Sequence, residues 1–141
     1  MLGNNTGEIF PSHLECEKGW SRHHNSCLKF VGTSASWITA KDNCAHLNSN
    51  LPSIHSTDKI SYITKLTVSS TLRGFWVGGT LGADESSFVW VDGSMFDLDK
   101  WAQNERTWGG SCIQVRGDLK WSYFPCKEKL PYICEKPLSG T

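Results

Sequence analysis

Apolar residues recur at helical spacing in the first half of the chain. One stripe has spacings of three, four and three and consists of Trp37, Ala40, Cys44 and Leu47. Residues at these spacings lie on one face of an α-helix, and Ser34 or Ser36 can cap its start. A second stripe consists of Ile60, Ile63 and Leu66, with Ser56 as a candidate cap. The pattern therefore predicts two amphipathic helices, both of them ahead of any long strand.

From Phe75 onward, short β-favouring runs replace the helical pattern. These runs are Phe75–Val77, Phe88–Val91, Cys112–Val115 and Tyr132–Cys134. Glycine-containing pairs are expected to break them, namely Gly78-Gly79, Asp92-Gly93 and Gly117-Asp118. Helices followed by short strands predict an α+β fold with an antiparallel sheet. The span 93–111 has few apolar residues, and a loop of this length in a compact domain is commonly functional.

Length and charge narrow the class of protein. A chain of 141 residues fits one domain with an enclosed core. Fourteen basic residues balance fourteen acidic ones, so no broad basic field is present to attract nucleic acid. No apolar run approaches the roughly 20 residues that cross a bilayer, which argues against membrane insertion within this chain. Residues 1–15 and 136–141 are polar and aperiodic, so we expect flexible tails around a folded unit at 16–135.

The cysteines indicate the compartment. There are six of them, at Cys16, Cys27, Cys44, Cys112, Cys126 and Cys134. The even count, without a CxxC pair or zinc-finger histidine spacing, favours structural disulfides over metal ligation and leaves the pairing open. Disulfides persist in oxidising surroundings, so we expect a secreted protein or the extracellular part of a cell-surface protein. The triplet Asn4-Asn5-Thr6 agrees, because it makes Asn4 an acceptor for N-glycosylation.

Five short motifs, in order along the chain, resemble one family. They are Gly19-Trp20 between Cys16 and Cys27, then Leu51–Ser56, Trp76–Gly79, Trp90–Gly93 and Pro131–Glu135. With the cysteines, they resemble the long form of the C-type lectin-like domain over residues 16–135. The resemblance implies an extracellular, non-catalytic recognition domain. It also implies three disulfides: Cys16 to Cys27, Cys44 to Cys134, and Cys112 to Cys126.

The calcium site of the sugar-binding members of that family is degenerate in this chain. In those members, acidic and amide side chains hold calcium, which takes about six to eight oxygen ligands. The family's Glu-Pro-Asn or Gln-Pro-Asp triplet corresponds to Glu105–Thr107, and its Trp-Asn-Asp triplet to Trp121–Tyr123. Gly110 replaces an acidic ligand, and at the auxiliary positions Glu85 is in place but Leu81 replaces a frequent Asp. Glu105 alone survives from the sugar-linked site, so no metal or other cofactor is expected there.

The long loop and the late strand beside it form the candidate ligand-binding region. The candidate residues are Glu105, Arg106, Thr107, Trp108, Trp121, Tyr123 and Phe124. Aromatic rings stack on sugars, and Arg with Trp and Tyr is typical of protein interfaces, so the ligand is a carbohydrate or a protein. We expect the rings of Trp101 and Trp121 to belong to the core, while the exposure of Trp108 stays open. A calcium-dependent carbohydrate-binding lectin is the alternative function.

Weaker signals come from a tripeptide and from the histidines. Arg116-Gly117-Asp118 spells an integrin-recognition motif, but Gly-Asp is also turn chemistry, so an adhesive or structural module is only a third hypothesis. Neighbouring strand residues such as His23 and His24 face opposite sides with no third ligand near, so we expect surface residues and no metal site. We expect a structural or capping role for His55. No catalytic motif is present, so no catalytic residue is assigned and an enzyme is not expected; the oligomeric state stays open.

Overall fold

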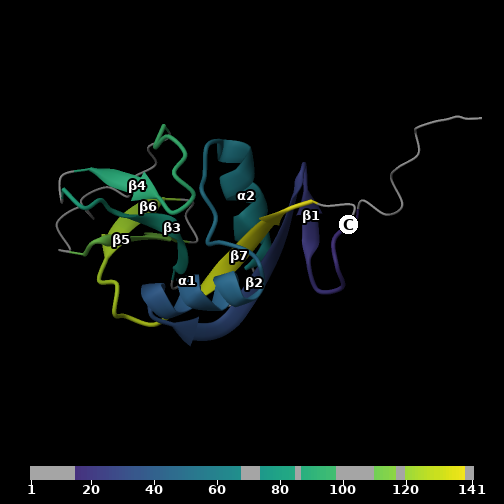
Figure 1. The fold of residues 1–141 in the computed structure, drawn as a ribbon, viewed down its shortest axis with the longest axis horizontal. Helices are drawn as coiled ribbons and strands as arrows, with labels where there is room; N and C mark the ends of the chain where they lie inside the picture. Colours follow the sequence, from purple (N-terminus) through teal and green to yellow (C-terminus); the bar gives the residue numbers. More distant parts are fainter. Residues whose placement is uncertain (1–14, 68–73, 85–86, 98–109, 117–119, 139–141) are drawn as a thin grey trace, which may run out of the picture.

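A computed structural model describes residues 15–67, 74–84, 87–97, 110–116 and 120–138 of the chain. Its elements, in order, are β1 (Ser21–His23), β2 (Ser26–Ala35), α1 (Trp37–His46), α2 (Thr57–Leu66), β3 (Phe75–Leu81), β4 (Phe88–Trp90), β5 (Cys112–Val115), β6 (Trp121–Phe124) and β7 (Leu130–Pro137). In this described part, two helices and a seven-stranded sheet form the predicted α+β fold (Figure 1).

Both helices begin at a capping serine. The Ser36 hydroxyl accepts a hydrogen bond from the Thr39 N–H at 3.3 Å, so the second of the two candidate serines caps α1. The Ser56 hydroxyl accepts from the Lys59 N–H at 3.1 Å and caps α2 as predicted. Leu47 departs from its predicted stripe, because it lies at the C-cap of α1 with 41% of its surface exposed. Within the described residues, no helix has the length and apolar character of a membrane span.

The sheet is mixed: most neighbouring strands are antiparallel as predicted, but the pair β3 and β7 is parallel. The strand order is β1-β2-β7-β3-β5-β6, with β4 paired to β3. Strands β2 and β7 are antiparallel, whereas β3 lies parallel to β7 with Trp76 opposite Tyr132. Parallel neighbours need a long connection, and β4, β5 and β6 lie between β3 and β7 in the chain. Local patterns do not reveal such distant pairing.

The long strand β2 comes before both helices, contrary to the prediction. It spans ten residues, and its outer part is the exposed, polar or glycine-containing stretch Gly32–Ser34. This stretch lacks the alternation of apolar and polar residues that marks a strand. Most of β2 is paired with β7, which runs on to Pro137. The Leu138 N–H then donates to the Asn25 carbonyl at 2.7 Å, so residues 136–138 are part of the fold.

The glycine pair Gly78-Gly79 does not break β3, which continues to Leu81. A Cβ added at Gly78 would lie 2.9 Å from the carbonyl oxygens of Leu51 and Pro52. A Cβ added at Gly79 would lie 2.5 Å from the Ile113 side chain. Real Cβ contacts are longer than this, so the two glycines let the strand pack closely against its neighbours.

Side-chain alternation along the strands creates two core clusters, one on each face of the sheet. On what we call the α1 face, α1 packs with a cluster that contains Trp37, Ala40, Cys44, Leu51, Trp76, Cys112, Leu130, Tyr132 and Cys134. On the α2 face, α2 packs with a cluster that contains Leu28, Ile54, Ile60, Ile63, Phe75, Val77, Trp90, Ile113, Val115, Trp121 and Ile133. Adjacent residues such as Trp76 and Val77 therefore contribute to different clusters, as the period of a strand requires.

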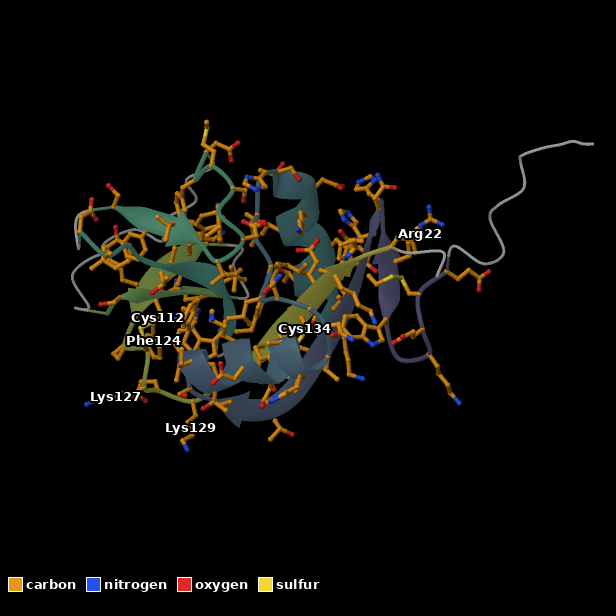
Figure 2. The ribbon with its side chains drawn as sticks, in the orientation of Figure 1. Arg22, Cys112, Phe124, Lys127, Lys129 and Cys134 are labelled. Atoms are coloured by element: carbon orange, nitrogen blue, oxygen red, sulfur yellow. A yellow bond between two sulfur atoms is a disulfide. The ribbon has the colours of Figure 1, made fainter. Side chains whose placement is uncertain are left out.

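The three disulfides implied by the resemblance are present (Figure 2). Cys16–Cys27 closes the first hairpin. Cys44–Cys134 joins α1 to β7 across 90 positions of sequence. Cys112–Cys126 joins β5 to the segment that follows β6. Helix α2 has a different link to β7, an ion pair in which the Lys59 ammonium lies 2.7 Å from the Glu135 carboxylate.

Candidate ligand-binding surface

Strands β5 and β6 form the hairpin on which the candidate surface is built. They pair antiparallel, with Ile113 opposite Tyr123 and Val115 opposite Trp121. The Arg116 N–H donates to the Lys120 carbonyl at 3.0 Å and closes the end of the ladder. Strands β5 and β6 therefore form an antiparallel hairpin. Gly117 and Asp118 of the integrin-like tripeptide lie outside the described residues.

The predicted binding residues on β6 do not share one face. Trp121 is fully buried in the α2-face cluster, which confirms the expectation that its ring belongs to the core. Tyr123 lies on the same face and is half-buried. Phe124 packs on the α1 face, with its ring 6.0 Å from that of Trp76. The structure therefore brings Tyr123, but not Phe124, to the candidate surface on the α2 face.

A row of aromatic rings leads from the core of the α2 face to Tyr123. We call it the aromatic layer, and it consists of Phe88, Trp90, Phe96, Trp121 and Tyr123. The rings of Tyr123 and Phe88 stack at 4.4 Å with an interplanar angle of 18°. Trp90 and Phe96 stack at 4.7 Å and 19°, and Trp121 meets Trp90 edge-on at 5.4 Å. Offset stacks and edge contacts of this kind hold rings in fixed orientations, so Tyr123 stands on a rigid support.

Phe88 and Phe96 also belong to this surface, although neither was among the predicted binding residues. The signal for Phe88 was available, because Phe88 and Trp90 alternate with Val89, which is 43% exposed. Phe96 follows β4 in the span that we assigned to a loop, and its contact with Trp90 depends on the path of that segment. The residue pattern does not show which path this segment takes through space.

A polar network fixes the segment that follows β4. The Asp92 carboxylate accepts hydrogen bonds from the Ser53 hydroxyl at 2.7 Å and from the Ser94 N–H at 2.9 Å and hydroxyl at 2.6 Å. Partial burial raises the pKa of Asp92, but the bonds from Ser94 and Ser53 and the nearby His55 outweigh it, so the pKa falls below the ordinary value. His55 has the predicted structural role, because its ring nitrogens bond Asp97 at 2.8 Å and Ser94 at 2.9 Å.

Ser122 has a hydroxyl that is fully buried. It accepts a hydrogen bond from the Gln114 side-chain amide at 2.9 Å, between neighbouring positions of β5 and β6. Gln114 is itself buried, with 4% of its surface exposed. The Ser122 oxygen therefore satisfies the buried Gln114 amide and does not contact solvent.

Gly110 lies against the backbone of β6. A Cβ built at this position would be 2.0 Å from the Phe124 carbonyl carbon and 2.2 Å from its oxygen. A side chain therefore cannot be added there without a backbone shift. Leu81, at the nearby end of β3, donates its N–H to the Ser111 carbonyl at 2.8 Å and carries no side-chain oxygen.

Comparison with protein families identifies the domain. Residues 33–136 match the family model described as the lectin C-type domain. The chain belongs to the C-type lectin domain family. This confirms the resemblance.

Similar proteins include both lectins and a solved structure of the same fold. A protein named lectin from Pleurodeles waltl is 37% identical over 86% of this chain and 76% of its own length. Galactose-specific lectin nattectin from Thalassophryne nattereri is 31% identical over 87% of this chain and 81% of its own length. A calcium-independent type II antifreeze protein superposes with a TM-score of 0.79 and 26% identity, over 88% of this chain and 95% of that one.

The long loop of this C-type lectin domain is described only in part. Gly93–Asp97 and Gly110–Ser111 are described, whereas Trp101 and the candidates Glu105, Arg106, Thr107 and Trp108 lie outside the described residues, as do Glu85 and the glycosylation acceptor Asn4. Their placement in the binding region stays a prediction.

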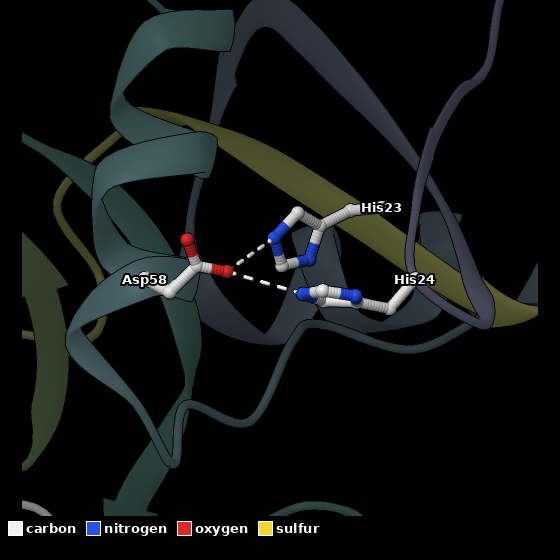
Figure 3. A group of neighbouring side chains, drawn as sticks. All are labelled: His23, His24 and Asp58. Atoms are coloured by element: carbon white, nitrogen blue, oxygen red, sulfur yellow. Dashed lines mark hydrogen bonds and ion pairs between the residues drawn. The ribbon is translucent and has the colours of Figure 1, made fainter.

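The expectation that His23 and His24 have no third ligand nearby is wrong. Asp58 of α2 lies 2.9 Å from Nε2 of His23 and 3.2 Å from Nε2 of His24 (Figure 3). Strand alternation does not separate the two rings, because His24 belongs to the turn after β1 and has a φ of 54°. These three residues form a group with metal-ligating side chains within the described part of the chain.

Proposed function

We propose that this C-type lectin domain is an extracellular, non-catalytic recognition module that binds a carbohydrate without the calcium chemistry of the sugar-binding members. The environment of Gly110 and Ser122 carries the proposal. Gly110 has no room for a side chain, and the Ser122 hydroxyl is buried against Gln114. Calcium takes about six to eight oxygens, and these two positions of the family's site offer no side-chain oxygen to a bound ion.

The aromatic layer supplies an alternative means of binding a sugar. Tyr123 is half-buried at one end of the layer and is stacked on Phe88. The apolar face of a sugar ring stacks on aromatic rings, and a tyrosine hydroxyl adds a hydrogen bond. We infer that Glu105, Arg106, Thr107 and Trp108 complete the binding surface beside Tyr123. The lectin names of two relatives support a carbohydrate ligand.

A protein ligand is the second candidate, and the composition of the same region supports it. Arg106, Trp108 and Tyr123 are of the residue types that dominate binding energy at protein interfaces. The three disulfides support an extracellular setting for either ligand, because they persist in oxidising surroundings.

The test is a glycan array and an array of extracellular proteins, each probed in calcium and in chelator. The proposal expects a glycan signal that is equal in both buffers and is lost in Tyr123→Ala. Val89→Ala is the matched control, because Val89 is an exposed apolar residue on β4, next in sequence to the Phe88 that stacks on Tyr123. Signal on the protein array alone would favour the second candidate. A glycan signal that chelator abolishes would restore the calcium-dependent alternative.

A further inference from the structure

A cluster of two histidines and an aspartate joins the first hairpin to helix α2. Nε2 of His23 and Nε2 of His24 lie 2.9 and 3.2 Å from the same oxygen of Asp58, and the three ligand atoms all lie within 4.8 Å of one another. Figure 3 shows both rings turned toward the Asp58 carboxylate. In a tetrahedral site with bonds of about 2.0–2.2 Å, ligand atoms are about 3.3 Å apart. Two of the three separations are close to this value.

The turn between β1 and β2 brings the two rings to one side. His23 pairs with Ser26, so His24 and Asn25 form the turn. His24 has a φ of 54°, in the left-handed region that residues other than glycine adopt rarely. This conformation directs its ring back toward α2 instead of away from the neighbouring ring. Two-residue hairpin turns favour a positive φ at their first central residue, so the turn itself places the His24 ring beside that of His23.

Neighbouring residues pack around His23, whereas the side chains of His24 and Asp58 are exposed to solvent. The His23 side chain is 13% exposed, and its ring lies 4.4 Å from that of Tyr62. The Tyr62 hydroxyl donates to the Arg22 carbonyl at 3.1 Å, and Arg22 Nε donates to the His24 carbonyl at 3.0 Å. The side chains of His24 and Asp58 are 75% and 69% exposed. An ion can therefore enter from solvent, and small rotations of two exposed side chains can close the third separation.

The chemistry of the donors selects the class of ion. Two imidazole nitrogens and one carboxylate oxygen are the ligands preferred by Zn²⁺ and related divalent transition metals. Calcium requires more oxygens than this cluster offers. Lys59, next to Asp58, has its charge engaged by Glu135 at 2.7 Å, and Arg22 points its Nε at a carbonyl. The carboxylate thus supplies a negative charge, and a water molecule can fill the remaining position.

We propose that His23, His24 and Asp58 form a binding site for Zn²⁺ or a similar divalent transition-metal ion, which joins the first hairpin to α2. Each imidazole binds the ion through the lone pair of Nε2 and, as a neutral ligand, keeps its one ring proton on Nδ1. Figure 1 places β1 at the opposite end of the molecule from β4, β5 and β6. The site is therefore separate from the aromatic layer, and ligand recognition does not depend on it.

The experiment titrates Zn²⁺ into the full 141-residue chain by calorimetry and records the melting temperature with and without Zn²⁺. Two variants remove ligands: His24→Gly, which suits the left-handed backbone, and Asp58→Asn, which keeps the shape of the side chain. His46→Ala is the matched control, because His46 is exposed at the end of α1 and outside the cluster. Melting without Zn²⁺ verifies that each variant is folded.

The proposal expects one Zn²⁺ per chain, with a rise in melting temperature, for the wild type and His46→Ala. It expects at least about tenfold weaker binding in both His24→Gly and Asp58→Asn. Long-range ¹H–¹⁵N spectra of the imidazoles should show Zn²⁺ shifting Nε2 of His23 and His24. No saturable binding by the wild type, wild-type affinity in either ligand variant, or an equal loss in His46→Ala would overturn the proposal.

Discussion

The α1 face and the α2 face share the same strands but are stabilised in different ways. The disulfides Cys44–Cys134 and Cys112–Cys126 lie in or against the α1-face cluster. In the described residues, the α2-face cluster contains no cysteine and consists of aliphatic and aromatic side chains. The aromatic layer belongs to this second face. The comparison indicates that disulfides stabilise one side of the sheet, while side-chain packing with polar contacts stabilises the side that carries the ligand surface.

The largest effect should come from removing the long-range disulfide. The double variant Cys44→Ala/Cys134→Ala opens a loop of 90 positions, and we expect a loss of about 4 to 5 kcal/mol in the free energy of unfolding. Chemical denaturation measures it. Cys16→Ala/Cys27→Ala is the control, because its separation of 11 positions predicts a smaller loss of about 3 kcal/mol. Equal losses would show that loop length does not explain the role of the bridge.

On the α2 face, truncating Trp121 should destabilise through packing alone. Trp121 is fully buried and contacts Trp90 and Phe96. Trp121→Ala leaves a large cavity, and we expect a loss of about 3 to 5 kcal/mol, measured by denaturant unfolding. Tyr123→Ala, at the half-buried end of the same layer, should cost clearly less. If both variants lost the same stability, Tyr123 would belong to the core and not to an exposed surface.

Some features of these two faces could be predicted from the sequence and others could not. Both helices, the runs that became β3, β4, β5 and β7, and the burial of Trp121 follow from periodicity and composition. Disulfide pairing came from the family resemblance, since six cysteines alone leave it open. The faces of Tyr123 and Phe124 could have been separated by the period of a strand, which our grouping of the two residues overlooked.

Other features depend on long-range or backbone effects that residue patterns do not carry. Gly32–Ser34 lies at a register shift within β2, and the residues on both sides of it, Val31 and Ala35, pair with distant residues of β7. His24 faces Asp58 because of its left-handed φ, which is uncommon for residues other than glycine. The close approach of Gly110 to Phe124 is visible only in three dimensions. The conformations of His24 and Gly110 determine which side chains can reach each candidate site, so the sites were less predictable than the fold.

A smaller effect should come from the buried hydrogen bond beneath the ligand surface. Ser122→Ala removes the partner of the buried Gln114 amide. An unsatisfied buried donor costs about 1 to 3 kcal/mol, which denaturant unfolding can resolve. The double variant Gln114→Leu/Ser122→Ala removes both polar groups and should recover part of the loss. If the loss in the double variant equalled the sum of the losses in Gln114→Leu and Ser122→Ala, the two side chains would not be energetically coupled.

The smallest effect should be a pH dependence at Asp92. Its pKa is lowered in the folded state, so the ionised carboxylate contributes stability above the unfolded-state pKa of about 3.9. This contribution is lost as the pH falls through the lower folded pKa. We expect the melting temperatures of the wild type and Asp92→Asn to converge between about pH 5 and pH 2. A difference that stays constant over this range would show that ionisation of Asp92 does not stabilise the fold.

The central claim is that this C-type lectin domain recognises its ligand through the aromatic layer without calcium. Calorimetry with the carbohydrate selected on the array tests it most directly, in calcium and then in excess chelator. We predict the same dissociation constant in both buffers for the wild type and no measurable binding for Tyr123→Ala. Binding that requires calcium, or that survives unchanged in Tyr123→Ala, would contradict the account.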